Sequence, residues 1–65
     1  MIVRIEYASE DGQREALINR DGTGWSVGRY RHTFETWDVE HIRPDKRTRT
    51  LTAAQAMARM WVEGK

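Results

Sequence analysis

The chain has 65 residues, of which 38% are hydrophobic and 32% charged, with eleven basic and ten acidic residues and a net charge of +1. A chain of this length predicts one domain, residues 1–65, which buries about 60% of the surface that its unfolded form exposes, and its apolar content excludes a disordered chain. Because cysteine is absent, disulfides and cysteine-ligated zinc are excluded as sources of stability, and the small net charge excludes strong overall attraction to nucleic acid or anionic membranes.

The N-terminal third predicts a hairpin. Residues 2–7 alternate apolar and polar side chains after Ile2, which is the pattern of a half-buried strand. Turn-forming residues at 9–13 include an Asp-Gly pair, and Asp-Gly suits backbone positions with positive φ. A second strand is therefore expected at 14–20.

The Asp-Gly-Thr-Gly sequence at 21–24 predicts a second tight turn, followed by a third strand at 25–32. The apolar positions of this strand lie on one face as far as Val27, whereas Tyr30 lies on the other. A glycine inside a strand often marks a bulge that shifts the alternation by one residue. We therefore expect a bulge or bend at Gly28.

A fourth strand is expected at 36–43, with an outer face made acidic by Asp38 and Glu40. Proline cannot donate to a strand ladder. Pro44 is accordingly predicted to end this strand, and residues 44–50 are predicted to form a basic connector.

The last element is a predicted helix at 51–62, starting at a capping box made by Thr52 and Gln55. Helical spacing places Ala54, Met57, Ala58 and Trp61 on the buried side and Gln55, Arg59 and Glu63 on the outer side. The predicted fold is an α+β domain of order β-β-β-β-α, in which an antiparallel sheet of three or four strands carries one C-terminal helix on one face. Its predicted core consists of Val3, Ile5, Tyr7, Trp25, Val27, Trp37, Val39, Met57 and Trp61.

The sequence contains no constellation typical of an enzyme. The two histidines, His32 and His41, lack the spacing of metal ligands, and neither Ser9 nor Ser26 lies in a nucleophile elbow. We therefore predict a protein that is not an enzyme and that uses no cofactor or metal.

Charged residues favour two kinds of binding surface. A basic cluster of Arg43, Lys46, Arg47 and Arg49 is opposed only by Asp45, and Arg29 and Arg31 would join it if the third and fourth strands are neighbours. This cluster indicates a small nucleic-acid-binding module. It is the alternative to protein binding, because few aromatic residues accompany it for base stacking.

The second surface is acidic. Residues 33–42 contain Glu35, Asp38 and Glu40 and no lysine or arginine. Such a row is either a solvated strand face or a surface that imitates phosphates and meets the basic groove of a nucleic-acid-handling protein.

A small cysteine-free domain of strands and one helix, with segregated surface charges and no catalytic constellation, resembles the inhibitors encoded by phages and mobile elements, particularly anti-CRISPR proteins. The resemblance implies non-enzymatic docking on a subunit of a CRISPR-Cas interference complex, which would block target-DNA binding or a required conformational step. No motif assigns individual residues. We place the expected docking surface at Glu35, Asp38, Glu40, Tyr30 and Arg31.

Location and oligomeric state follow as expectations. Arg4 and Glu6 interrupt the apolar residues of the N-terminus, unlike a signal peptide, so we expect a cytoplasmic protein, in the bacterial host cytoplasm if the chain is phage-encoded. A monomer is expected. A homodimeric structural protein that presents Ala56 and Met60 to a second copy is the third possibility.

Overall fold

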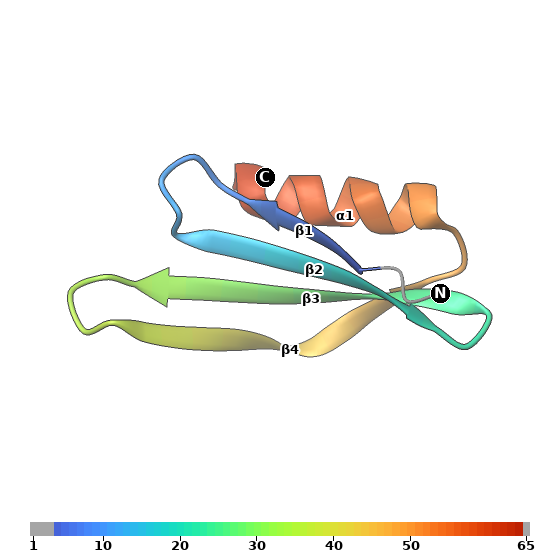
Figure 1. The fold of residues 1–65 in the computed structure, drawn as a ribbon, viewed down its shortest axis with the longest axis horizontal. Coiled ribbons are helices and arrows are strands. Elements are labelled where there is room, and N and C mark those ends of the chain that lie inside the picture. Colours follow the sequence, from blue (N-terminus) through green and yellow to red (C-terminus); the bar gives the residue numbers. More distant parts are fainter. Residues whose placement is uncertain (1–3, 65) are drawn as a thin grey trace.

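Four antiparallel strands and one helix make up the fold, in the predicted order β-β-β-β-α (Figure 1). The structure is a computed structural model, and it describes residues 4–64. The strands lie in the sheet in their sequence order, and the helix packs mainly on the second and third of them. The elements are β1 (Arg4–Ala8), β2 (Arg14–Asp21), β3 (Gly24–Thr33), β4 (Asp38–Thr48) and α1 (Leu51–Glu63).

The first two turns lie where the sequence predicts them. Between β1 and β2, Gly12 has φ 73°, and the Asp11 carboxylate accepts hydrogen bonds from the Ser9 hydroxyl (2.7 Å) and the Gln13 backbone N–H (3.0 Å). Between β2 and β3, Asp21 pairs with Gly24 around a turn in which Gly22 has φ 62°. Glycine adopts these positive φ angles without the steric cost that a Cβ atom brings.

The third turn differs from the prediction. The strand expected at 36–43 begins at Asp38, which pairs with Thr33, and the four residues Phe34–Trp37 form the turn. Trp37 has φ 58°, in the left-handed region, where a bulky side chain is unusual. The turn contains no glycine or asparagine that would mark it in the sequence. The alternation of residues 36–43 therefore predicts a strand that starts two residues too early.

Pro44 does not end β4, so the predicted connector at 44–50 is wrong. The strand continues through a cis Arg43–Pro44 peptide to Thr48. Along β3, Val27 pairs with Lys46 and Arg29 with Ile42, so residues 43–45 of β4 stand opposite a single residue of β3. A proline that cannot donate to the ladder is tolerated here because it lies within this bulge on an edge strand.

Gly28 marks the register shift as predicted, but the extra residues belong to β4. Strand β3 keeps its alternation against β2 without interruption, with Leu17 opposite Gly28. The predicted change of face within β3 is therefore wrong, and Arg29 stays on the face of Val27. A Cβ at position 28 would lie 3.2 Å from the Tyr30 ring, a tight contact that glycine avoids.

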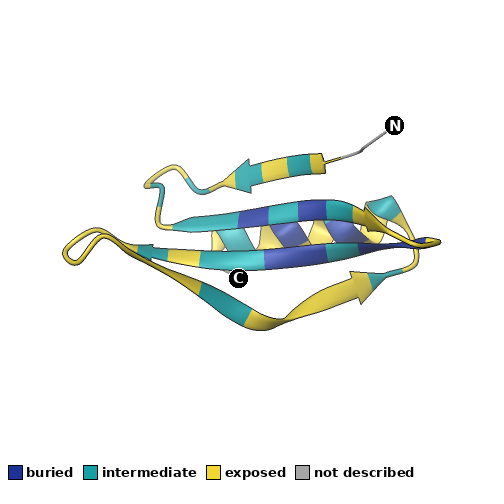
Figure 2. Cartoon of the chain, turned by 60° about the horizontal axis from the view of Figure 1, so that its bottom comes forward, coloured by how far each residue is buried: buried dark blue, intermediate teal, exposed yellow. Residues whose placement is uncertain are grey.

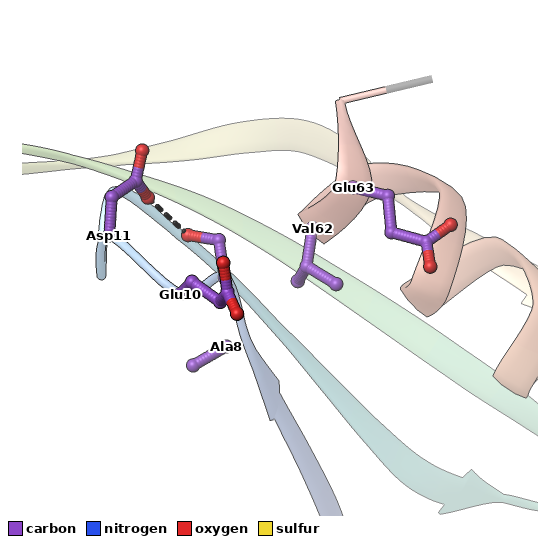
Figure 3. A pocket seen from close by; sticks show the side chains of 6 residues that line it. Ala8, Glu10, Asp11, Val62 and Glu63 are labelled. Carbon is purple, nitrogen blue, oxygen red and sulfur yellow. Dashed lines mark hydrogen bonds between the residues drawn. The ribbon is translucent and has the colours of Figure 1, made fainter.

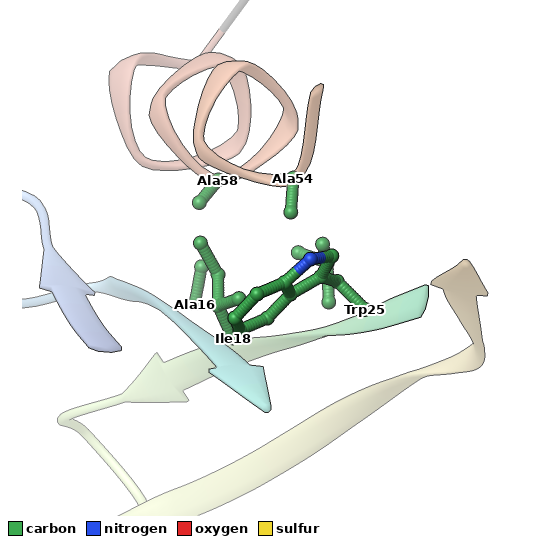
Figure 4. Packing of buried hydrophobic residues seen from close by; sticks show 6 residues of the cluster. Ala16, Ile18, Trp25, Ala54 and Ala58 are labelled. Carbon is green, nitrogen blue, oxygen red and sulfur yellow. The ribbon is translucent and has the colours of Figure 1, made fainter. Parts of the chain in front are cut away.

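The core lies between α1 and the middle of β2 and β3 (Figures 2 and 4). Its six buried hydrophobic residues are Ala16, Ile18, Trp25, Val27, Ala54 and Ala58, and Ile5, Tyr7, Leu51, Trp61 and Val62 pack against them. Two alanines on the helix bring its backbone close to the Trp25 ring (Figure 4). Core burial of an aromatic side chain of this size is a large part of the stability of so short a chain.

The predicted core is correct in the middle of the sheet and wrong at its margin. Trp25 and Val27 are buried, but Trp37, Val39 and Met57 are exposed. Val3 lies outside the described residues. The error has a physical cause: β4 is an edge strand on which α1 makes little contact, and most of it is exposed (Figure 2).

The helix is capped two residues earlier than predicted. Thr50, with an extended backbone, is the N-cap, and its hydroxyl accepts the Ala53 N–H (3.2 Å). The capping box at Thr52 and Gln55 is therefore wrong, and the side chain of Gln55, expected to face outward, is half-buried. At the other end Gly64, with φ 77°, caps the last turn, as left-handed glycines commonly do.

Candidate functional site

The residues expected to form the docking surface gather at the β3–β4 hairpin but do not share one face. Arg31 lies 3.8 Å from Glu40 and 5.7 Å from the Trp61 ring of α1, so both residues are on the helix-bearing side. Tyr30 lies on the opposite, helix-free side, where its ring stacks on His41. Glu40 thus does not belong to an acidic outer face, and that prediction is wrong because the β3–β4 register turns it toward Arg31.

Two further members of the predicted surface lie in the hairpin turn and directly after it. Glu35 lies in the turn and Asp38 begins β4, and both are exposed. They stand on either side of Trp37, so the tip of the hairpin combines aromatic and acidic side chains.

The basic residues Arg43, Lys46, Arg47 and Arg49 are exposed on β4 and the bend after it, rather than in a connector. Adjacent strand residues face opposite sides of a sheet. Lys46 accordingly lies beside the helix, opposite Val27, whereas Arg47 lies opposite Ser26 on the helix-free side, where it pairs with Asp21 (3.3 Å). The structure therefore does not place these four residues on one basic surface.

Two groups of rings, which sequence reasoning missed, lie on the helix-free face and at the hairpin tip. The Tyr30 and His41 rings stack with centroids 4.7 Å apart, His32 and Phe34 stack at 6.5 Å, and Phe34 meets Trp37 edge-on at 6.1 Å. We call these five residues the aromatic strip. The available signal was the spacing of two between Tyr30, His32 and Phe34, which alternation places on one side.

Each histidine of the strip is held by a carboxylate. His32 Nε2 lies 2.5 Å from Glu15 on the neighbouring strand β2, and His41 Nε2 lies 2.6 Å from Asp45 four residues along β4. These contacts fix both imidazole rings on the helix-free face. They also place negative charge beside these rings.

Trp37 is the most unusual residue of the strip. Its exposed fraction is 82%, and its left-handed backbone costs about 1–2 kcal/mol for a residue other than glycine. Phe34 beside it is also exposed. The described fold recovers little of this cost through burial, and strain at an exposed aromatic residue is typical of a binding site.

An acidic depression lies elsewhere, between the β1–β2 turn and the end of α1 (Figure 3). It has a volume of about 570 Å³, and Glu10, Asp11 and Glu63 are among its lining residues. The hydrogen bonds that Asp11 accepts, first from the Gln13 N–H and then from the Ser9 hydroxyl, lower the pKa of this carboxyl. The Asp11 carboxylate therefore stabilises the β1–β2 turn, which is a structural role.

Neither a metal-ligand cluster nor a membrane-spanning helix is present in the described part of the chain. Within residues 4–64 no three histidine, aspartate or glutamate side chains are grouped so that they could hold a metal ion. In the same residues no helix has the length and apolar character needed to cross a membrane. Comparison with protein-family models, curated protein sequences and solved structures finds no match for this chain.

Proposed function

We propose that this protein is a non-enzymatic binding protein that docks on a protein partner through the aromatic strip, with the tip of the β3–β4 hairpin as its anchor. The observation that carries the proposal is Trp37, which is exposed and held in a left-handed conformation beside Phe34. Tryptophan and tyrosine are enriched among the residues that contribute most binding energy at protein interfaces. A ring fixed on a hairpin also loses little conformational freedom on binding.

The charges beside the strip favour a protein partner over nucleic acid. Glu15 and Asp45 contact the two histidines, and Arg47 is paired with Asp21 beside the β2–β3 turn, away from the hairpin tip. Phosphates approaching the two imidazole rings would meet these carboxylates, whereas nucleic-acid sites combine stacking rings with unpaired basic residues.

The charges at the tip favour a partner with a basic surface. Glu35 and Asp38 flank Trp37 and are exposed. Basic grooves occur on proteins that handle nucleic acids, and complementary charge speeds the encounter. We therefore propose, as the specific form of this function, an inhibitor of the anti-CRISPR type that docks on a CRISPR-Cas interference complex and blocks target-DNA binding or a required conformational step.

The test uses purified interference complexes with their target DNA. The protein should co-elute with a complex and abolish its DNA binding, and Trp37→Ala should remove both effects. Arg49→Ala, an exposed change away from the strip, is the matched control and should retain them. If no interference complex binds the wild-type protein, the inhibitor function is wrong; if a complex binds wild type and Trp37→Ala equally well, the aromatic strip is not the docking surface.

A further inference from the structure

A second surface lies on the helix-bearing side of the sheet. A cavity of about 190 Å³ opens between the last turns of α1 and strands β3 and β4. Its lining residues are Arg29, Lys46, Met57, Met60 and Trp61, and we call it the methionine pocket. Met60 is 53% exposed. Two methionines at the rim of a pocket give a surface that adapts to apolar side chains of different shape.

Positive charge is concentrated around Trp61, one of the residues that line this pocket. Three guanidinium groups approach the Trp61 ring, with distances to its centroid of 4.6 Å for Arg14, 6.0 Å for Arg29 and 5.7 Å for Arg31. Lys46 adds a fourth cation at the rim. Among the described residues, Arg31 alone of these four lies within salt-bridge distance of a carboxylate, that of Glu40.

The remaining arginines of this cluster bind backbone oxygens. Arg14 Nη1 donates to the Trp61 carbonyl (3.1 Å), and Arg29 Nη2 donates to the Pro44 carbonyl (2.9 Å). Arg29 Nε is buried and has no hydrogen-bond partner within the described part of the chain. Partly buried cations with so few counter-charges attract an anionic partner, because hydrogen bonds to charged groups are strong and leaving such groups unpaired is costly.

We propose that the methionine pocket binds an acidic protein segment that inserts one apolar side chain between Met57 and Met60 and places neighbouring carboxylates beside Lys46 and Arg29. The volume is below the roughly 300–1,000 Å³ of sites for drug-sized ligands, which suits a single side chain of a partner better than a small molecule. The apolar side chains of Met57, Met60 and Trp61 among its lining residues distinguish the pocket from a phosphate track. This inference concerns the face opposite the aromatic strip and does not rest on the function proposed above.

A second copy of the chain fits the pocket less well. A two-fold interface places the same patch of each copy in contact. Centred on this pocket, such an interface would set Lys46 and Arg29 against the same cations of the other copy. An acidic segment would instead bring carboxylates to these cations, so it would meet attraction rather than repulsion.

The experiment selects ligands from a displayed library of random peptides, each about 12 residues long. Wild-type protein should enrich peptides in which aspartate or glutamate lies within a few residues of leucine, isoleucine, phenylalanine or tryptophan. A selected peptide is then synthesised with a fluorescent label, and its affinity for wild type and variants is measured by anisotropy.

Three exposed-site variants separate the possible results. Lys46→Glu should weaken binding about tenfold or more by reversing a charge at the rim. Met60→Gln, which keeps the approximate size and the charge of the side chain, should weaken it several-fold, because a polar amide replaces the thioether and methyl group that would pack on the inserted apolar side chain. Arg49→Glu makes the same charge change away from the pocket and should leave affinity within about twofold.

Several results would overturn the inference. Enrichment of peptides without acidic residues, or no enrichment, would show that the pocket does not take an acidic segment. Equal weakening by Lys46→Glu and Arg49→Glu would show that net charge alone drives binding. Tighter binding of single-stranded DNA than of any selected peptide, unaffected by Met60→Gln, would assign the surface to nucleic acid. Light scattering that shows a dimer disrupted by Lys46→Glu would assign it to self-association.

Discussion

Trp25 and Trp37 lie on the same hairpin, yet their environments are opposite. Trp25 is 8% exposed beneath α1, whereas Trp37 is 82% exposed at the turn. The lengths of the elements explain the difference: ten residues of β3 span about 33 Å, while thirteen residues of α1 span about 20 Å. The helix therefore covers one part of the sheet, and the β3–β4 hairpin extends past it (Figure 1).

This comparison assigns different roles to the two regions. Under the helix, small residues such as Ala54 and Ala58 allow close packing, and the indole of Trp25 contributes to stability through burial. At the hairpin tip, the same side-chain type is exposed on a strained backbone and contributes little to the fold. We infer that the covered part is the scaffold and that the extended hairpin is the binding element.

The largest expected effect is on the scaffold. Trp25→Ala removes a buried indole from beneath α1 and should lower the free energy of unfolding by about 3–5 kcal/mol, measured by urea denaturation. Trp37→Ala removes the same side chain at the tip and is the matched control, with an expected change within about 0.5 kcal/mol. Similar losses in the two variants would contradict the division into scaffold and binding element.

A smaller effect tests the start of the helix. Thr50→Ala removes the hydroxyl that accepts the Ala53 N–H and should cost about 1 kcal/mol of unfolding free energy. Thr52 is the second residue of the helix and is not its cap, so Thr52→Ala should cost less, within about 0.5 kcal/mol. If Thr52→Ala proved the more damaging of the two, the capping assignment would be wrong.

The smallest effect concerns the β1–β2 turn and depends on pH. Hydrogen bonds from the Gln13 N–H and the Ser9 hydroxyl hold the pKa of Asp11 below its ordinary value of 3.8. Because the folded pKa is lowered, the carboxylate stabilises the fold above the ordinary pKa, and this contribution is lost as the pH falls through the folded pKa. Asp11→Ala should therefore be less stable than wild type at neutral pH and equal to it in strong acid, as followed by denaturation at both pH values. A difference that persisted unchanged in acid would exclude this role.

The order of the elements could be predicted from the sequence because its signals are local. Asp-Gly pairs located the first two turns, alternation located β1 to β3, and the apolar spacing after Leu51 located the helix. The N-cap was predicted wrongly because Thr52 and Gln55 have the spacing of a capping box, whereas Thr50, which lacks such a partner three residues later, also has a hydroxyl that can accept a backbone N–H.

The candidate site was less predictable because its properties depend on which elements lie next to each other. The alternation of residues 36–43 places Trp37 and Val39 on the apolar face of a strand. It does not show whether the helix covers that strand. The face of Glu40 depends on the β3–β4 register, and the bulge at residues 43–45 sets that register. Likewise, Arg29 and Arg31 interrupt the apolar pattern of β3, and only their position around Trp61 shows that they remain on the helix side.

The most direct test of the binding role is to measure stability and partner binding on Trp37→Gly. Glycine relieves the left-handed strain of about 1–2 kcal/mol, less roughly 0.5–1 kcal/mol for its greater freedom when unfolded. The unfolding free energy should therefore be unchanged or up to about 1.5 kcal/mol higher, while affinity for the proposed partner, an interference complex, should fall by about 30-fold or more, as for an interface residue worth at least 2 kcal/mol. A variant that binds like wild type, or one that loses more than about 1 kcal/mol of stability, would contradict the assignment of Trp37 to binding rather than to the fold.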